Sequence, residues 1–456
     1  MVFACALSAQ AAEGANPSLP SVLLITVDTL RADHLTCYGY QFNTSPNIDR
    51  LANEGTRFDK AYTVVPLTGP AHFSLFTSKY PQEHGARRNG VSLAKGAVPV
   101  SFPRILRKHG YRNAAFISGW PLTKRLTHLD RWFHYYDEEL PRTYQLFNSS
   151  RYAEDVTPRA LRWLRGRAGK KRPFFLWIHY FDPHEPYVFR EAFRQRKANG
   201  DPTPAPLPWT NAAFEERVRG YDSEIAYTDH HIGVLLSALD ELKLRESTLV
   251  VLTADHGESL GEHDYVGHGR HLFENIIRIP LVVRLPGAVP AGRVISSPVS
   301  ILDIGPTILD LTVEKLPRYK RPPVLHSGHS FVAAFRDGGR LPERTQYYVT
   351  FAGKKGFAPS WLSWLWVHDG ELPLRFGRLK GDDKTVWSPG DDSLEIYDVS
   401  ADRYETRPIQ LDPGNSEYGK ETASLRWWFS ATEFREGEDS LTSRDLEVLK
   451  SLGYLQ

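Results

Sequence analysis

The chain is poor in cysteine and in long apolar segments. Only two of its 456 residues are cysteines, Cys5 and Cys37, too few for a disulfide framework or a thiolate metal cluster. No apolar run reaches the ~18 residues that a membrane-spanning helix needs. The 56 basic and 54 acidic side chains leave a net charge of +2, so no basic field indicates nucleic acid or anionic lipid as a partner. With 41% hydrophobic residues the chain can bury a sizeable core, and a globular enzyme is the class that remains.

The N-terminus is the only segment that resembles a targeting signal. Residues Met1–Ala12 read MVFACALSAQAA, an apolar stretch whose Ala9-Gln10-Ala11 has the form of a signal-peptidase site. We therefore expect a short signal segment within residues 1–18 and export to the periplasm or the extracellular space. An apolar terminus without a targeting role is the alternative.

The first two thirds of the chain alternate between strand-like and helix-like patterns. Short apolar runs that end in polar clusters predict buried strands over Ser21–Asp28, Tyr111–Ser118, Phe174–Tyr180, Ser247–Asp255 and Ile279–Leu285. Between them, apolar residues at 3–4 spacing predict helices over Pro46–Glu54, Ser101–His109, Thr157–Leu164 and Glu224–Leu242. This alternation predicts an α/β domain over residues 19–315, with a mostly parallel sheet flanked by helices.

After about residue 315 the pattern changes. Residues Pro322–Arg344 are rich in turn formers, and aromatic, alternating segments follow at Trp361–Val367 and Leu394–Val399. Alternation of this kind is typical of antiparallel strands. Residues 316–456 are therefore predicted to form a smaller C-terminal α+β domain on an antiparallel sheet.

Three of the predicted strands end in residues that carry chemistry. Asp28 follows the first strand, the stretch from His179 to His184 follows the third, and Asp255-His256 follow the fourth. In an open parallel sheet, ligands bind at the carboxyl ends of the strands. A single carboxylate at a strand end is often only a loop cap, but three such ends together predict a site at this edge.

The segment Asp255–His271 has the highest density of histidine in the chain. Its sequence, DHGESLGEHDYVGHGRH, holds four histidines in 17 residues, and its glycines predict an irregular loop. Imidazole beside carboxylate is a ligand set for zinc or manganese, whereas calcium prefers oxygen throughout. A solvated polar loop is the alternative.

A helix start is predicted at Thr68, because Thr68-Gly69-Pro70 precedes an apolar helical run and proline is favoured in the first helical turn. Thr68 is either a simple N-cap or a nucleophile, since a helix N-terminus favours an anion. If a divalent metal held by Asp28 and Asp255 also touches its oxygen, the alkoxide becomes accessible.

With these motifs in view, the chain resembles the sulfatase family of the alkaline phosphatase superfamily over nearly its whole length. The resemblance rests on VDTLRADHLTCYGY, LTGPAHFSLFTSKYPQEHG, HYFDPHEPY, YDSEIAYTDHHIG, TADHGESLGEHDYVGHGRHLFENIIRIPLVVRLPG, SLEIYDVSADRYE and LEVLKSLGYLQ. It implies a large α/β domain that carries the site and a smaller C-terminal domain on a short antiparallel sheet, in agreement with the pattern above.

The resemblance also implies roles for single residues. Asp28, Asp255 and His256 match the family's metal ligands, and the oxygen of Thr68, at the nucleophile position, is a further ligand. His184 matches a histidine that contacts the ester or leaving-group oxygen. His268 stands where many sulfatases have a lysine that holds the transferred group, and a second metal at His184 and His268 is a further possibility that the resemblance leaves open.

The departures from the family pattern bear on the chemistry. Sulfatases carry Cys or Ser at the nucleophile position, which is oxidised to formylglycine, whereas Thr68 is not a substrate for that conversion, so no formylglycine is expected. His72 replaces the arginine that braces formylglycine, and is predicted to contact the oxygens of the transferred group or to pack under the helix. The family's lysine motif is missing from Ile117–Leu122, with Lys124 as a weak substitute for substrate binding.

A threonine nucleophile with an Asp-His pair is also the pattern of lipoteichoic acid synthase and the phosphoethanolamine transferases. The sequence thus predicts a metal-dependent hydrolase that cleaves a phosphate or sulfate ester of a small-molecule or glycan substrate through a covalent intermediate on Thr68. Phosphate is favoured, because threonine cannot become formylglycine. A phosphotransferase acting on an envelope glycolipid or polymer, and a non-catalytic binding protein on the same fold, are the alternatives.

Overall fold

The computed structural model describes residues 19–93, 100–140, 150–195, 211–314, 327–336, 338–351, 373–432 and 437–439. The predicted signal segment (residues 1–18) and the predicted strand at Trp361–Val367 lie outside these residues. Within them, no helix combines the length and the apolar character that crossing a membrane requires.

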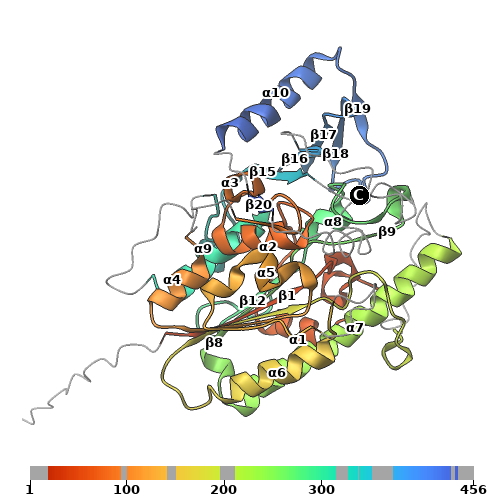
Figure 1. Cartoon of the computed structure of the whole chain (residues 1–456). Helices are drawn as coiled ribbons and strands as arrows, with labels where there is room; N and C mark the ends of the chain where they lie inside the picture. Colours follow the sequence, from red (N-terminus) through yellow and green to blue (C-terminus); the bar gives the residue numbers. More distant parts are fainter. Residues whose placement is uncertain are drawn as a thin grey trace, which may run out of the picture.

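An eight-stranded sheet forms the centre of the molecule (Figure 1). Its strands lie in the order β13 (Arg293–Ile295), β2 (Thr56–Phe58), β12 (Leu281–Arg284), β8 (Thr248–Ala254), β1 (Ser21–Val27), β7 (Phe174–Tyr180), β5 (Arg112–Ile117) and β6 (Tyr135–Asp137). The five strands from β8 to β6 are parallel, whereas β12 is antiparallel to both β8 and β2. The mostly parallel sheet predicted from the sequence is thus confirmed, with β12 as the exception.

The three central strands are buried along their whole length. Every residue of β1, β7 and β8 is shielded from solvent, because helices cover both faces of the sheet. This explains why their sequences are continuous apolar runs and do not alternate. Burial of such runs supplies the largest favourable contribution to folding, at roughly 25 cal/mol per Å² of apolar surface.

The helices form two layers, one on each face of the sheet (Figure 1). One layer holds α1 (Pro46–Glu54), α6 (Ala153–Arg165) and α7 (Ala212–Glu241), and the other holds α2 (Thr68–Thr77), α4 (Phe102–Lys108) and α9 (Ile304–Thr312). Helix α7 begins twelve residues before the predicted start at Glu224, because the side chain of Asn211 caps it by accepting a hydrogen bond from the N–H of Phe214 (3.0 Å).

Short elements connect these layers. The short helices are α3 (Pro81–His84), α5 (Lys124–Thr127) and α8 (Glu274–Ile277). Short strands pair as β11 (Arg278–Ile279), β3 (Ala61–Tyr62) and β14 (Val299–Ser300), as β9 (Ser259–Leu260) with β10 (Val266–Gly267), and as β4 (Val91–Ser92) with β20 (Glu438–Asp439).

The C-terminal part of the chain builds a second sheet with its own apolar cluster. Five antiparallel strands follow one another in chain order: β15 (Gln346–Thr350), β16 (Arg375–Lys380), β17 (Asp383–Ser388), β18 (Ser393–Asp398) and β19 (Ile409–Leu411). Helix α10 (Ser416–Ala431) packs beside it (Figure 1). The predicted antiparallel sheet is confirmed, and the predicted strand at Leu394–Val399 corresponds to β18.

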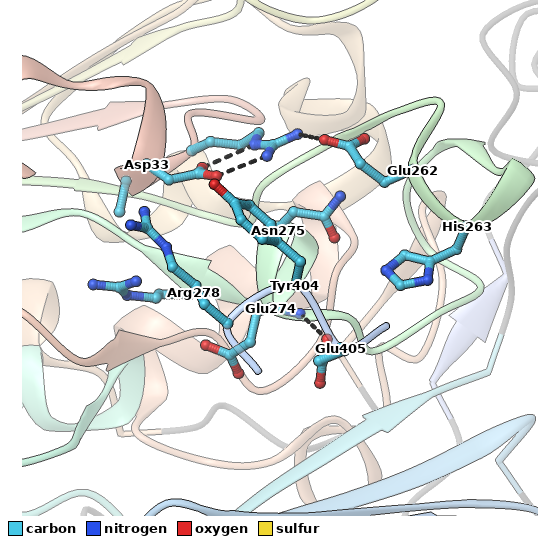
Figure 2. A pocket seen from close by; sticks show the side chains of 11 residues that line it. Asp33, Glu262, His263, Glu274, Asn275, Arg278, Tyr404 and Glu405 are labelled. Atoms are coloured by element: carbon cyan, nitrogen blue, oxygen red, sulfur yellow. Dashed lines mark hydrogen bonds and ion pairs between the residues drawn. The ribbon is translucent and has the colours of Figure 1, made fainter. Parts of the chain in front are cut away.

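A cluster of buried charges, which we call the junction cluster, joins β17 of the C-terminal sheet to helix α8: Lys384, Glu274 and Glu405. The Lys384 ammonium lies 2.6 Å from Glu405 Oε1 and 3.3 Å from Glu274 Oε1, with no solvent exposure. A small polar cavity borders the cluster, lined by residues of both parts of the chain (Figure 2). These contacts anchor the C-terminal sheet to helix α8, which lies in the segment between β8 and β12.

Candidate active site

The carboxyl ends of the three central strands bring together the residues that the sequence placed there. In the sheet register, Val27 of β1 stands beside Tyr180 of β7 and Ala254 of β8. The residues that directly follow β1 and β8, Asp28 and Asp255, therefore emerge at the same level. This follows directly from parallel pairing, in which strand ends of equal register share one edge.

Asp255 is oriented by the backbone around it. Its Oδ1 accepts hydrogen bonds from the N–H of His256 (2.9 Å) and of Thr29 (3.3 Å). Its Oδ2 has no hydrogen-bond partner among the described residues. One oxygen is thus fixed by the loop, and the other remains as an acceptor.

His256 is oriented in a similar way. Its Nδ1 donates to the carbonyl of Gly257 (3.0 Å), which leaves a lone pair on Nε2. Within the described part of the chain, that Nε2 has no hydrogen-bond partner, nor has Oδ1 of Asp28. A hydrogen bond that fixes one ring nitrogen and presents the other is the usual arrangement of a metal-binding histidine.

Asp28, Asp255 and His256 fit a divalent metal. Each offers a ligand atom, and these atoms lie within 4.8 Å of one another. Burial raises the pKa of Asp28 to about 7 and also raises the pKa of Asp255, which lies beside the Asp28 charge. Among the described residues only histidines make ion-pair contacts with these carboxylates. Two buried carboxylates without a Lys or Arg partner are costly unless a cation neutralises them.

Thr68 is the first residue of α2 and is fully buried. Its Oγ1 donates to Asp28 Oδ2 over 3.3 Å. Leu67 occupies the N-cap position and no side chain caps the helix from there, so the simple N-cap role weighed from the sequence is not the one that the hydroxyl takes. The hydroxyl instead faces the carboxylate group that fits a metal.

Asn89 is a site residue that sequence reasoning missed. Its Oδ1 accepts the N–H of Gly69 in the first turn of α2 (2.7 Å), and a Cβ at Gly69 would lie 3.0 Å from that oxygen. Its Nδ2 is buried and has no hydrogen-bond partner among the described residues. Asn89 stands 20 residues after Gly69, a separation that matches no known motif, so no signal in the sequence indicated this contact.

His184 and His268 lie together next to Asp28, Asp255 and His256, the three residues that fit a metal and that we call the metal-ligand group. Their ring centroids are 5.2 Å apart, and the ring of His268 lies 4.3 Å from that of His256. His184 stacks on Phe181 (4.3 Å, 15°), while His268 Nδ1 is 3.0 Å from Oε1 of the buried Glu258. The structure thus brings both predicted histidines to the site and adds Glu258, which orients one of them.

His72 and Lys124 are placed differently from the contacts predicted for them. The His72 ring is buried beneath α2, and both of its nitrogens are bonded inside the protein: Nδ1 to the Thr68 carbonyl (2.7 Å) and Nε2 to Thr26 Oγ1 (3.1 Å). This geometry agrees with the packing alternative. Lys124 is 45% exposed at the start of α5, and its ammonium lies 3.8 Å from Glu138, in a groove beside β6.

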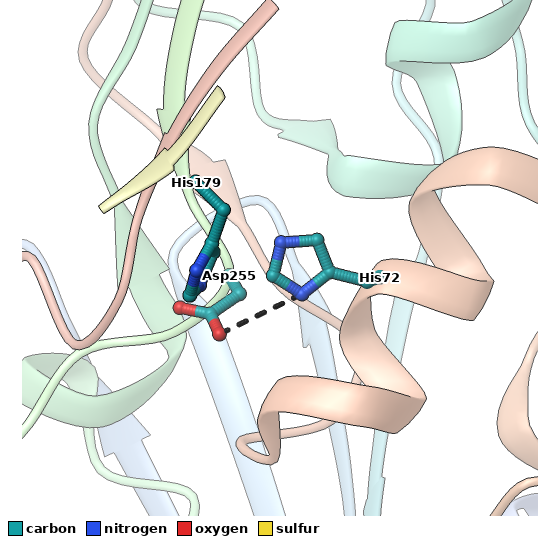
Figure 3. Close-up of side chains that lie close together, drawn as sticks. All are labelled: His72, His179 and Asp255. Atoms are coloured by element: carbon teal, nitrogen blue, oxygen red, sulfur yellow. Dashed lines mark ion pairs between the residues drawn. The ribbon is translucent and has the colours of Figure 1, made fainter. Parts of the chain in front are cut away.

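A second histidine, His179, faces His72 across the floor of the site (Figure 3). Its Nε2 lies 3.3 Å from Asp28 Oδ2, and neither ring nitrogen has a hydrogen-bond partner in the described part of the chain. His72, His179 and Asp255 also bring one ligand atom each within 4.8 Å. However, a carbonyl only accepts hydrogen bonds, so His72 Nδ1 carries the proton and is not a metal ligand here.

This fold and this edge define the class. A large, mostly parallel sheet that gathers an Asp, an Asp-His pair and a hydroxyl at a helix N-terminus is the arrangement of the alkaline phosphatase superfamily of ester hydrolases. A sequence model of the sulfatase family matches residues 20–314. The chain belongs to the sulfatase family.

Comparisons with single proteins agree with this assignment. The chain is 24% identical to N-acetylglucosamine-6-O-sulfatase of Bacteroides thetaiotaomicron, over 94% of this chain and 89% of that one. It is 25% identical to the multifunctional alkaline phosphatase superfamily protein PehA of Trinickia caryophylli, over 93% and 99% of the two chains. Its fold matches the phosphonate monoester hydrolase of Silicibacter pomeroyi with a TM-score of 0.68 at 20% identity, covering 93% of this chain and all of that one.

Proposed function

We propose that the protein is a metal-dependent phosphoesterase of the sulfatase family that uses Thr68 as its nucleophile. The observation that carries the proposal is the Thr68 hydroxyl, buried at the start of α2 and hydrogen-bonded to Asp28 at the edge of the metal-ligand group. Asp28, Asp255 and His256 would hold a divalent metal, with zinc or manganese suited to the mixed N/O set. Such a metal lowers the pKa of a bound hydroxyl and polarises the transferred group.

The residues around Thr68 prepare the attack. Its proton lies in a hydrogen bond to Asp28 Oδ2 (3.3 Å), so a proton acceptor stands beside the hydroxyl. The first turn of α2 presents backbone N–H groups near the oxygen, where the helix favours negative charge. Gly69 permits Asn89 to approach this turn closely. The arrangement suits a nucleophile that becomes negative as it attacks.

His184 and His268 are proposed to act on the leaving group. We propose that one of them donates a proton to the leaving oxygen or stabilises its developing charge. The contact with Glu258 (3.0 Å) places the Nδ1 proton of His268 on the Glu258 side, which fixes the tautomer of the ring. A second metal at these two histidines is the competing arrangement.

The preference for phosphate follows from the single hydroxyl of Thr68. Formylglycine hydrate carries two hydroxyls, of which one attacks sulfur and the other expels sulfate by collapse to the aldehyde. Thr68 has one hydroxyl on a carbon that also bears a methyl group, so this collapse is impossible. Water must attack the transferred centre in line, a displacement that phosphoryl groups undergo readily when their oxygens are stabilised by a cation and hydrogen-bond donors.

The substrate would be an anionic ester of a small molecule or glycan. Relatives bear on this point: one is named as an N-acetylglucosamine-6-O-sulfatase, and a solved structure of similar fold is a phosphonate monoester hydrolase. We further propose export to the periplasm or the extracellular space on the basis of Met1–Ala12, a proposal that fractionation of cells producing the full chain tests.

A rate screen tests the proposed function. The purified protein is assayed on matched p-nitrophenyl sulfate, phosphate monoester, phosphodiester and phosphonate monoester, each with added zinc, manganese or calcium. We expect a higher kcat/KM on a phosphate monoester or diester than on the sulfate. A clear preference for the sulfate would contradict the argument from the single hydroxyl.

Metal analysis distinguishes the two roles of His184 and His268. If they hold a second ion, wild-type protein saturated with zinc binds two ions per chain, and His268→Ala binds one. A stoichiometry of one in both proteins would assign the two histidines to the substrate.

A further inference from the structure

The floor of the site contains a hydrogen-bond chain that reaches the nucleophile residue from beneath. Trp177 on β7 donates its indole N–H to Thr26 Oγ1 on β1 (2.9 Å). Thr26 Oγ1 lies 3.1 Å from His72 Nε2, and His72 Nδ1 lies 2.7 Å from the carbonyl of Thr68. All four residues are buried, so water does not compete for these bonds.

The direction of each bond in the chain is determined by its ends. The indole N–H only donates, and the Thr68 carbonyl only accepts. His72 Nδ1 must therefore carry a proton, and in the neutral ring Nε2 accepts from the Thr26 hydroxyl. The four groups then have a single consistent set of donors and acceptors.

This series of hydrogen bonds connects one face of the central sheet to Thr68, the proposed nucleophile. Trp177 and His179 lie two residues apart on β7 and so share a face of the sheet, and Thr26 on β1 lies two residues before Asp28, which follows that strand. The His72 ring contacts both residues of the β7 pair, with a centroid separation of 5.3 Å to Trp177 and of 5.0 Å to His179, which Figure 3 shows beside it. The strands that carry the metal-ligand group thereby also set the position of the first turn of α2.

We propose that the Trp177–Thr26–His72 chain positions Thr68 for attack, with His72 and Thr26 as positioning residues that touch neither substrate nor metal. The inference rests on the proposed role of Thr68. Its physical basis is that small displacements of a nucleophile reduce its rate steeply, whereas binding of the substrate depends on other contacts. Loss of these hydrogen bonds should therefore reduce kcat and leave KM and metal content nearly unchanged.

Thr26→Val tests the proposal, with Thr26→Ser as the matched variant that restores the hydroxyl. On the phosphate ester that the wild type turns over fastest, we expect Thr26→Val to lower kcat about 10- to 100-fold with KM changed less than about twofold. Thr26→Ser should recover kcat to within about threefold of the wild type. Zinc per chain, measured by mass spectrometry, should be equal in all three proteins.

Trp177→Phe provides a second test should Thr26→Val fail to fold. It removes the outer donor but keeps the Thr26–His72 bond, so kcat should fall by a smaller factor, about two- to fivefold, at unchanged metal content. Equal kcat in Thr26→Val and Thr26→Ser would overturn the proposal, as would a metal loss that matches the loss of kcat. If Trp177→Phe has to carry the test, an unchanged kcat overturns it.

Thr68→Ala, measured in parallel, separates this inference from the proposed function. If Thr68→Ala retains activity, the nucleophile assignment fails and the positioning role fails with it. If Thr68→Ala is inactive while Thr26→Val matches the wild type, only the positioning role is wrong.

Discussion

The catalytic edge and the junction cluster both bury carboxylates, but only one of them supplies a cationic side chain. At the junction, Glu274 and Glu405 share the ammonium of Lys384. At the catalytic edge, Asp28 and Asp255 have histidines as their ion-pair contacts among the described residues. Burial raises the pKa of both, as it raises that of Glu405 at the junction, so the difference between the two places lies in the cationic partner. The junction carboxylates therefore have a cationic side chain within the protein, whereas the edge carboxylates have no Lys or Arg partner among the described residues.

The comparison separates two uses of buried charge within one molecule. At the junction, carboxylates with a lysine partner join β17 of the C-terminal sheet to helix α8. At the edge, Asp28 and Asp255 each have one oxygen without a hydrogen-bond partner among the described residues, beside an imidazole lone pair and without a lysine, an arrangement that fits a metal ion. Changes at the edge should therefore act on turnover and metal, and changes at the junction on stability.

The largest expected effect is that of Thr68→Ala. Removal of the proposed nucleophile should lower kcat by several orders of magnitude, on the order of 10³ or more, without unfolding the protein. Mass spectrometry of quenched wild-type enzyme should show phosphate on Thr68. Thr68→Ser keeps a hydroxyl and should recover part of the activity, and a Thr68→Ala variant near wild-type kcat would show that the nucleophile is another group.

His256→Ala should reduce metal content and turnover together. His256 supplies one of three ligand atoms, and loss of one of few ligands weakens the whole set, typically by 10–100-fold or more in affinity. His263→Ala is a matched control, since His263 lies in the same loop but stacks on Phe273 (3.9 Å). Activity that persists in metal-free protein would remove the basis for the metal-ligand group.

At the junction, Lys384→Ala should destabilise the fold by about 3–5 kcal/mol, because it leaves two carboxylates buried without a cation. Lys60→Ala is the control, since its ion pair with Asp382 is partly exposed and should contribute only about 0–1 kcal/mol. Urea unfolding measures both. Similar losses for the two variants would mean that burial does not distinguish these ion pairs.

The smallest expected effect concerns the pH dependence of stability in metal-free protein. The pKa of Asp28 is raised from 3.8 to about 7, so between these values the folded state binds more protons at this group than the unfolded state. The contribution of Asp28 to the free energy of unfolding is therefore present at low pH and is lost as the pH rises toward 7. His72 and His179, whose pKa values burial lowers to about 3 and about 4, act in the opposite direction.

The difference in Tm between wild type and Asp28→Asn isolates this contribution. In metal-free protein, wild type should lose Tm relative to Asp28→Asn as the pH rises from 5 to 7. Added metal requires the ionised carboxylate, so the increase in Tm that zinc causes in the wild type should grow over the same interval. A difference that stays constant with pH would contradict a raised pKa for Asp28.

Much of the fold could be predicted because its signals are local. The runs at β1, β7 and β8 are apolar throughout, and parallel pairing alone then places Asp28 and Asp255 on one edge. The start of α2 at Thr68 is likewise predicted by the local sequence Thr68-Gly69-Pro70. By contrast, the early start of α7 depends on a single cap at Asn211, thirteen residues before the apolar pattern that predicted the helix.

The sequence by itself predicted five of the eight strands of the central sheet, the edge at which the central ones end, and the residue types that gather there. Only the tertiary structure decided what each polar atom does: that His72 bonds to Thr68 and Thr26, that Asn89 bonds to Gly69, and that Lys384 neutralises carboxylates at the junction. The physical reason is that a hydrogen bond depends on the position of its partner. Thr26 and Trp177 are 151 residues apart, and Lys384 and Glu274 are 110 apart, so no local pattern records these pairings.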